Sequence, residues 1–242
     1  MQFNKTTATI LAMSLTALLT GCEAEQTEKD MLAEAQFCLD EATDATSANA
    51  CMSKIEGLNS EQAYTLRCAA GFIGAEVTSP ANLSNALNAI NGDSGAAGML
   101  SALSFPSLSE AEATFNNCNQ SGSSGLQLIG AMAKSATVLA SSSFASCASN
   151  PADCNVSEIT NSIQDLITGL NASDPDAEAT VTTIVSSIQT VYTSTCSAGA
   201  SSNDEICGQI NSAVATSGFD ITTTDPAQLV AIGKELLQNW QN

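Results

Sequence analysis

Apolar residues recur every three or four positions along most of the chain, which is the pattern of amphipathic helices. The clearest stripe predicts a long helix that begins near Asp174-Pro175-Asp176 and reaches about Cys196. Its inward positions are Val181, Ile184, Val185, Ile188, Val191 and Tyr192. Across residues 125–143 apolar side chains occupy nearly every face, which indicates a buried central helix. Val-Thr runs within the long stripe favour strands by propensity, but the helical period outweighs that preference.

Residues that favour helix ends separate these stripes. Ser107-Leu108-Ser109-Glu110 has the form of a capping box for a helix that reaches about Cys118. Ser79-Pro80 predicts another helix to Ile90, with the serine as cap and the proline at the first helical position. Further helix starts are predicted at Asn59-Ser60, Ser157, Ser202 and Asp225-Pro226. The sequence therefore predicts an all-α fold, a compact multi-helix bundle of roughly eleven helices.

The first 21 residues have a different pattern. A polar start that carries one charge, Lys5, is followed by an apolar run from Ala8 to Leu19. This run is about 12 residues long, whereas crossing the hydrocarbon core of a membrane takes ~20. A basic start, a short apolar run and small residues at its end are typical of a secretory signal peptide.

The end of this segment, Leu19-Thr20-Gly21-Cys22, resembles the lipobox of bacterial lipoprotein precursors. The resemblance implies that residues 1–21 are a signal peptide and that Cys22 becomes the lipidated first residue of the mature protein. Several acyl chains anchor a protein stably, since each buried CH₂ contributes ~0.8 kcal/mol. Glu23 follows the cysteine, where an aspartate would favour the inner membrane, so we expect attachment to the outer membrane, facing the periplasm. The alternative is an ordinary signal peptide with a chance cysteine.

Residues 22–30 would then be the lipidated cysteine and a polar tether, and residues 31–242 a single helical domain. The chain has nine cysteines, and lipidation of Cys22 leaves eight. An even number of cysteines in an exported chain predicts four disulfides. The eight are Cys38, Cys51, Cys68, Cys118, Cys147, Cys154, Cys196 and Cys207.

Eight cysteines allow 105 connectivities, and the sequence alone does not choose among them. In an antiparallel hairpin Cys38 would face Cys51. Cys147 and Cys154 flank a loop that contains Asn150-Pro151, and Cys196 and Cys207 flank a Gly-Ser loop in the same way. Cys68 and Cys118 then remain as a long-range pair. The closest spacing is C-x₆-C, so the C-x₂-C pairs of zinc sites are missing.

Charge and composition exclude several function classes. The chain has 25 acidic and 6 basic residues and a formal net charge of −19, and loss of Lys5 would make it more negative by one. Binding of nucleic acid or of anionic lipid surfaces needs positive charge. The chain contains no histidine, which removes Ser-His-Asp and Cys-His catalysis and histidine-ligated metals. We expect no cofactor, no metal and no nucleic-acid partner.

Three segments only partly match functional motifs. Gly92-Asp93-Ser94-Gly95 is similar to the segment around the nucleophile of chymotrypsin-like proteases, but no base accompanies it, and we predict a turn. The segment from Gly125 to Gly130, followed by Lys134-Ser135, resembles a phosphate-binding P-loop stretched by three residues. A P-loop needs Gly-Lys-Ser/Thr in direct succession, so we reject this interpretation. Asp174, Asp176 and Glu178 resemble the start of a calcium loop that lacks its glycine and final glutamate, so helix capping explains them better.

Three functions remain open. We expect a non-enzymatic accessory or scaffold lipoprotein that binds another envelope protein. The alternative is a carrier of a hydrophobic ligand, held in a cavity left by small residues at 96–104 and 125–143. A hydrolase that uses two carboxylates needs no histidine and requires two buried acids in a cleft. Arg67, the single arginine, is expected to pair with a nearby acid, and Trp240 to pack on the bundle.

Overall fold

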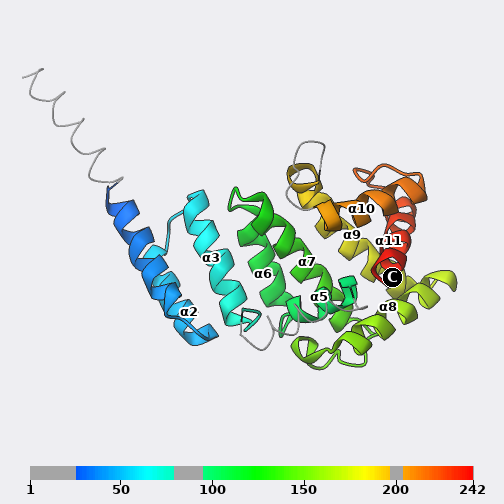
Figure 1. Cartoon of the computed structure of the whole chain (residues 1–242), viewed down its shortest axis with the longest axis horizontal. Helices are drawn as coiled ribbons and strands as arrows, with labels where there is room; N and C mark the ends of the chain where they lie inside the picture. Colours follow the sequence, from blue (N-terminus) through cyan, green and yellow to red (C-terminus); the bar gives the residue numbers. More distant parts are fainter. Residues whose placement is uncertain (1–25, 79–94, 197–203, 242) are drawn as a thin grey trace, which may run out of the picture.

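A computed structural model describes residues 26–78, 95–196 and 204–241 of the chain. Within these ranges every regular element is helical and no strand occurs, so the all-α prediction is confirmed. The helices lie side by side in an elongated array (Figure 1), with residues 26–40 at one end and α8 and α11 towards the other. No helix of the described ranges is both long and apolar enough to span a membrane.

The N-terminal region, residues 26–75, forms one end of the array. It contains a helix at 26–40, α2 (Ala45–Met52), the 3₁₀ turn η1 (Ser53–Ile55) and α3 (Glu61–Gly74). Asp44 caps α2 by accepting a 2.8 Å hydrogen bond from the Ser47 backbone N–H, and the Ser47 hydroxyl accepts one from the Asp44 N–H. These two bonds satisfy backbone donors that a helix start leaves unpaired.

The N-terminal region is built on small clusters of buried side chains. One cluster contains Leu39, Ala48, Cys51 and Ala70, and a second contains Ala35, Ile55 and Ala63. Only the last turns of α3 add to the main core, through Cys68, Phe72 and Ala75. The region therefore buries little apolar surface of its own, and we expect its disulfides to contribute a large share of its stability.

The middle of the array is formed by α5 (Gly95–Leu103), α6 (Leu108–Asn119) and α7 (Ser124–Ser141). Ala131, Ala136 and Leu139 of α7 are fully buried, because α6, α9, α5 and α8 all pack against this helix. This arrangement confirms the prediction of a buried central helix. The Thr137 hydroxyl accepts a 2.9 Å hydrogen bond from the Phe105 N–H and so fixes the chain between α5 and α6.

The C-terminal bundle, residues 151–241, completes the main core. Its elements are η2 (Pro151–Asp153), α8 (Val156–Asn171), α9 (Pro175–Thr195), α10 (Asp204–Ser217) and α11 (Pro226–Gln241). The predicted stripe of α9 is buried except for Tyr192, which is partly exposed; Val181, Ile184 and Ile188 are at most 1% exposed. Trp240 is 2% exposed within the bundle, as predicted. Close packing of α11 on α9 requires Gly233, since a Cβ there would lie 2.1 Å from Val181 Cγ1.

Some helix boundaries differ from the predictions. The cap of α8 is Asn155 and not Ser157, because the Asn155 side chain and Glu158 form a complete capping box two residues earlier. Residues 26–30, predicted as part of a tether, are helical, and Gln26 donates a 3.0 Å hydrogen bond to Asp30 one turn later. Glutamine and lysine favour helices, so the helix extends back beyond its apolar stripe. The predicted helix at 80–90 and the predicted start at Ser202 lie outside the described residues.

Candidate functional site

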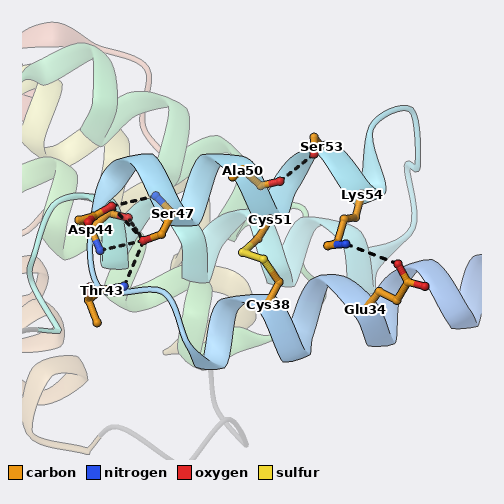
Figure 2. Close-up of a disulfide and its surroundings, with 9 residues drawn as sticks. All are labelled: Glu34, Cys38, Thr43, Asp44, Ser47, Ala50, Cys51, Ser53 and Lys54. Carbon is orange, nitrogen blue, oxygen red and sulfur yellow. Dashed lines mark hydrogen bonds and ion pairs between the residues drawn. A yellow bond between two sulfur atoms is a disulfide. The ribbon is translucent and has the colours of Figure 1, made fainter.

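The eight cysteines of the described ranges form four disulfides: Cys38–Cys51, Cys68–Cys118, Cys147–Cys154 and Cys196–Cys207. These are the four pairs favoured by the sequence. Figure 2 shows the first of them joining helix 26–40 to α2, beside the ion pair between Lys54 and Glu34 at 3.6 Å. Since all eight thiols are used, none of these cysteines is available as a nucleophile or metal ligand. Cys22 lies outside the described residues.

Several of the described carboxyl groups cap helix starts or turns. Among the Asp and Glu residues whose side chains the structure describes, none is buried, and no group of three potential ligands in the described residues could hold a metal ion. The backbone N–H of Ser47 lowers the pKa of Asp44, and that of Thr222 lowers the pKa of Asp220. Asp174 accepts from the Asp176 N–H at the start of α9. This confirms the capping interpretation of that acidic segment.

The other partly matching motifs supply no site in the described residues. The segment from Gly125 to Ser135 lies inside α7, and Ser135 is fully buried there, so it forms no phosphate-binding loop. Residues 92–94 of the protease-like tetrapeptide lie outside the described residues, and Gly95 begins α5. The small residues of α7 allow close packing: a Cβ on Gly130 would lie 2.8 Å from Cys118 Cβ.

A groove of about 320 Å³ runs along α3, between α2 and α6. Its floor is the small-residue face of α3, and its walls carry polar side chains from both neighbours. The lining residues are Ala45, Asn49 and Met52 of α2; Arg67, Ala70, Gly71 and Gly74 of α3; Glu110, Ala113, Thr114 and Asn117 of α6; and Ala75 and Phe105. This volume lies at the lower end of the range for ligand pockets.

The two glycines on the floor allow the walls to approach. A Cβ on Gly71 would lie 2.1 Å from Thr114 Oγ1, and one on Gly74 would lie 3.4 Å from the Ala45 backbone. Larger residues at these positions would therefore separate the helices or fill the groove. The Cys68–Cys118 disulfide then fixes α6 against α3, with a Cα–Cα distance of 4.8 Å.

Arg67 lies at one end of this groove. Its Nη2 donates a 2.9 Å hydrogen bond to the Ile55 carbonyl, and its guanidinium carbon lies 5.3 Å from the centre of the Tyr64 ring. Within the described part of the chain no carboxylate lies within 4.0 Å of it. The predicted ion pair of Arg67 is therefore wrong for these residues, because the carbonyl and the aromatic ring take the place of the acid.

The groove thus contains a cation with no described carboxylate within 4.0 Å, on a protein with a net charge of −19. A guanidinium has five N–H donors in a planar fork that fits a carboxylate. One of the donors is used by Ile55. Two contacts, with the Ile55 carbonyl and the Tyr64 ring, orient the Arg67 side chain.

A second hollow, of about 410 Å³, lies beside the Cys147–Cys154 loop. Its lining is Ser143, Phe144, Ala145, Ser146, Asn161, Gln164 and Asp165. It contains no cation and a single carboxylate, so it offers less specific chemistry than the groove. Compared with protein-family models, curated proteins and solved structures, the chain matches none of them.

Sequence reasoning did not find the groove. Its floor and its two walls come from three separate helices. The periodicity of one helix does not show which neighbouring helix its face will contact. One signal was available: Ala70, Gly71 and Gly74 give α3 a face of small residues next to the chain's single arginine. Such a face allows close helix packing, and Arg67 marks where it is charged.

Proposed function

We propose that the chain is an accessory protein of the bacterial cell envelope that binds another envelope protein through the α2–α3–α6 groove. In this proposal the signal peptide, residues 1–21, is removed and lipid on Cys22 attaches the protein to the outer membrane, facing the periplasm. The lipobox resemblance supports the anchor. The four disulfides support an oxidising compartment, where such bonds persist.

The observation that carries the binding role is the unneutralised Arg67 in the groove. An oriented cation without an acidic partner favours recognition of an anionic group, and the apolar floor beside it adds contact area. Only residues 23–25 separate Cys22 from Gln26, the first described helical residue. The covalent chain between Cys22 and Gln26 spans at most about 14 Å, so the groove-bearing end is also the end attached to the membrane.

Neither alternative function gains support from a specific contact. The carrier hypothesis placed its cavity among small residues of 96–104 and 125–143, and Ala97, Ala131 and Ala136 of these segments are at most 3% exposed in packed helices. The hydrolase hypothesis needs buried acids, and the described Asp and Glu side chains are all at least partly exposed. We therefore propose a non-enzymatic role.

The binding role is tested by photo-cross-linking in the cells that produce the protein. A photoreactive residue replaces Asn49, which lies exposed on the groove wall, and in a matched control it replaces Asp165, which lies exposed at the second hollow. We expect position 49 to form a discrete adduct that Arg67→Gln abolishes and that position 165 does not form. The same adducts at both positions, or an adduct unchanged by Arg67→Gln, would contradict the proposal.

The anchor is tested separately with Cys22→Ser. We expect this variant to carry no lipid and to keep residues 1–21, because it lacks the thiol whose modification precedes cleavage, while its helical content stays unchanged. Mass spectrometry of the purified wild-type protein checks the modification. An unmodified Cys22, or an amino terminus at any other residue, would contradict lipidation and leave the groove proposal to its own test.

A further inference from the structure

The two ends of the groove carry opposite charges. The Cys68–Cys118 disulfide and the contact of Gly71 with Thr114 show that α6 runs antiparallel to α3. Asn117 therefore lies near Arg67, and Glu110 lies near Gly74, two turns away along α3. Seven residues of helix rise about 10 Å. An extended chain spans the same distance in about three residues.

We infer that the groove binds the carboxyl terminus of a partner protein in an extended conformation, with its terminal carboxylate at Arg67 and the basic side chain of the third residue from its end at Glu110. This inference rests on the proposed function and names the partner segment. A carboxylate accepts two parallel hydrogen bonds from a guanidinium, a geometry that a neutral group cannot reproduce. Asn49 and Asn117 on the walls supply further donors and acceptors for the backbone of the bound segment.

The charge distribution of the protein selects this ligand over a multiply charged anion. A net charge of −19 repels a phosphate group, and Glu110 in the groove adds to that repulsion. A segment that carries one carboxylate and one basic group is nearly neutral. Its basic group is attracted by the acidic surface, and its carboxylate meets the one cation of the groove.

The walls also set the size of the side chains that fit. The middle of the groove is lined by Ala70, Gly71 and Thr114, with Met52 and Phe105 towards its ends. With a volume of about 320 Å³, the groove favours small residues between the two charged ends of the segment. We therefore expect a terminal sequence of the type Lys-Ala-Ala.

The inference is tested with three peptides and the full mature protein. The probe is N-acetyl-Lys-Ala-Ala with a free carboxylate; the second peptide has a carboxyl-terminal amide, and the third has Gln in place of Lys. Binding is measured from amide chemical shifts of the protein. We expect the free carboxylate to bind at least tenfold more tightly than the amide, and the largest shifts to lie at Asn49, Arg67 and Thr114.

Two variants test separately which peptide group each charged residue of the groove recognises. Arg67→Gln should bind the free acid and the amide equally, and Glu110→Gln should bind the Lys and Gln peptides equally. Lys54→Gln is the matched control, because Lys54 pairs with Glu34 outside the groove, and it should retain both preferences. If Arg67→Gln fails to fold, Arg67→Lys replaces it and should reduce the preference for the acid without removing it.

Equal binding of the acid and the amide by the wild-type protein would overturn the inference, and so would shifts centred on residues 143–165. Retention of the acid preference by Arg67→Gln would overturn it as well. These results are distinguishable from failure of the proposed function. If the peptides do not bind but position 49 still forms its Arg67-dependent adduct in cells, a partner occupies the groove through other chemistry, and only the inference fails.

Discussion

The N-terminal region and the C-terminal bundle are both helical, yet different interactions stabilise them. In the C-terminal bundle α8, α9 and α11 bury long aliphatic side chains and Trp240 in one large core. In the N-terminal region, small clusters and disulfides hold three helices together, and Phe37 is left 73% exposed. A groove forms where packing is incomplete. The groove along α3 therefore lies at the part of the protein with the smaller core, which is where our proposal places partner binding.

Removal of the Cys68–Cys118 disulfide should have the largest effect, because this bond joins the N-terminal region to α6 in the middle of the array. In the chain-entropy account a loop with a sequence separation of 50 contributes about 4 kcal/mol, and one with a separation of 7 about 2.5 kcal/mol. We expect Cys68→Ala/Cys118→Ala to destabilise the protein more than Cys147→Ala/Cys154→Ala does. Urea unfolding followed by circular dichroism measures both. A larger loss in the second variant would contradict this ranking.

Truncation of one buried side chain in each region should have the next largest effect. Ile188 of α9 is 1% exposed in the large core, and Leu39 is 5% exposed in a small cluster. Replacing a buried Ile or Leu by Ala costs about 2–5 kcal/mol, depending on how far the site relaxes. We expect Ile188→Ala near the upper end and Leu39→Ala near the lower end. Trp240 fluorescence should report the first loss fully and the second only in part.

Acid should affect the N-terminal region through the cap of α2. The Ser47 backbone N–H lowers the pKa of Asp44 in the folded state from 3.8. The charged cap therefore stabilises the fold at neutral pH, and this contribution is lost as pH falls from about 3.8 through the lower folded pKa. Asp44→Asn should reduce the dependence of stability on pH in this range, since asparagine caps a helix in either condition.

The matched control for the cap is Asp40→Asn, which changes an exposed aspartate on helix 26–40. We expect this variant to keep the acid sensitivity of the wild-type protein. Urea midpoints at neutral pH and below pH 3.8 measure the difference for each protein. Equal acid sensitivity of Asp44→Asn and the wild type would show that the cap does not carry the effect.

Much of the fold could be predicted because its signals are local. The stripe of α9, the cap at Asp174 and the turn signals between paired cysteines all lie within one or two turns of sequence. The cap of α8 was misplaced because Asn155 and Ser157 are both good capping residues, and only the reciprocal bonds with Glu158 distinguish them. The N-terminal helix was predicted to start too late because its first turn is polar on every face.

The groove could not be predicted because it depends on contacts between distant segments. The sequence shows that Arg67 is the single arginine. Whether an acidic side chain lies close to it depends on how α2 and α6 pack on α3. An ion pair is the common arrangement for a half-buried arginine. Here the Ile55 carbonyl and the Tyr64 ring replace the acid. The role that we propose for Arg67 depends on these contacts, which the sequence does not show.

The most direct measurement identifies the peptide that is joined to position 49 after photo-cross-linking in cells. Mass spectrometry of the adduct gives both the partner and the segment in the groove. Our account predicts the carboxyl-terminal peptide of one envelope protein, with a basic residue near its end, and loss of this adduct in Arg67→Gln. An internal peptide at position 49, or an adduct that persists in Arg67→Gln, would contradict it.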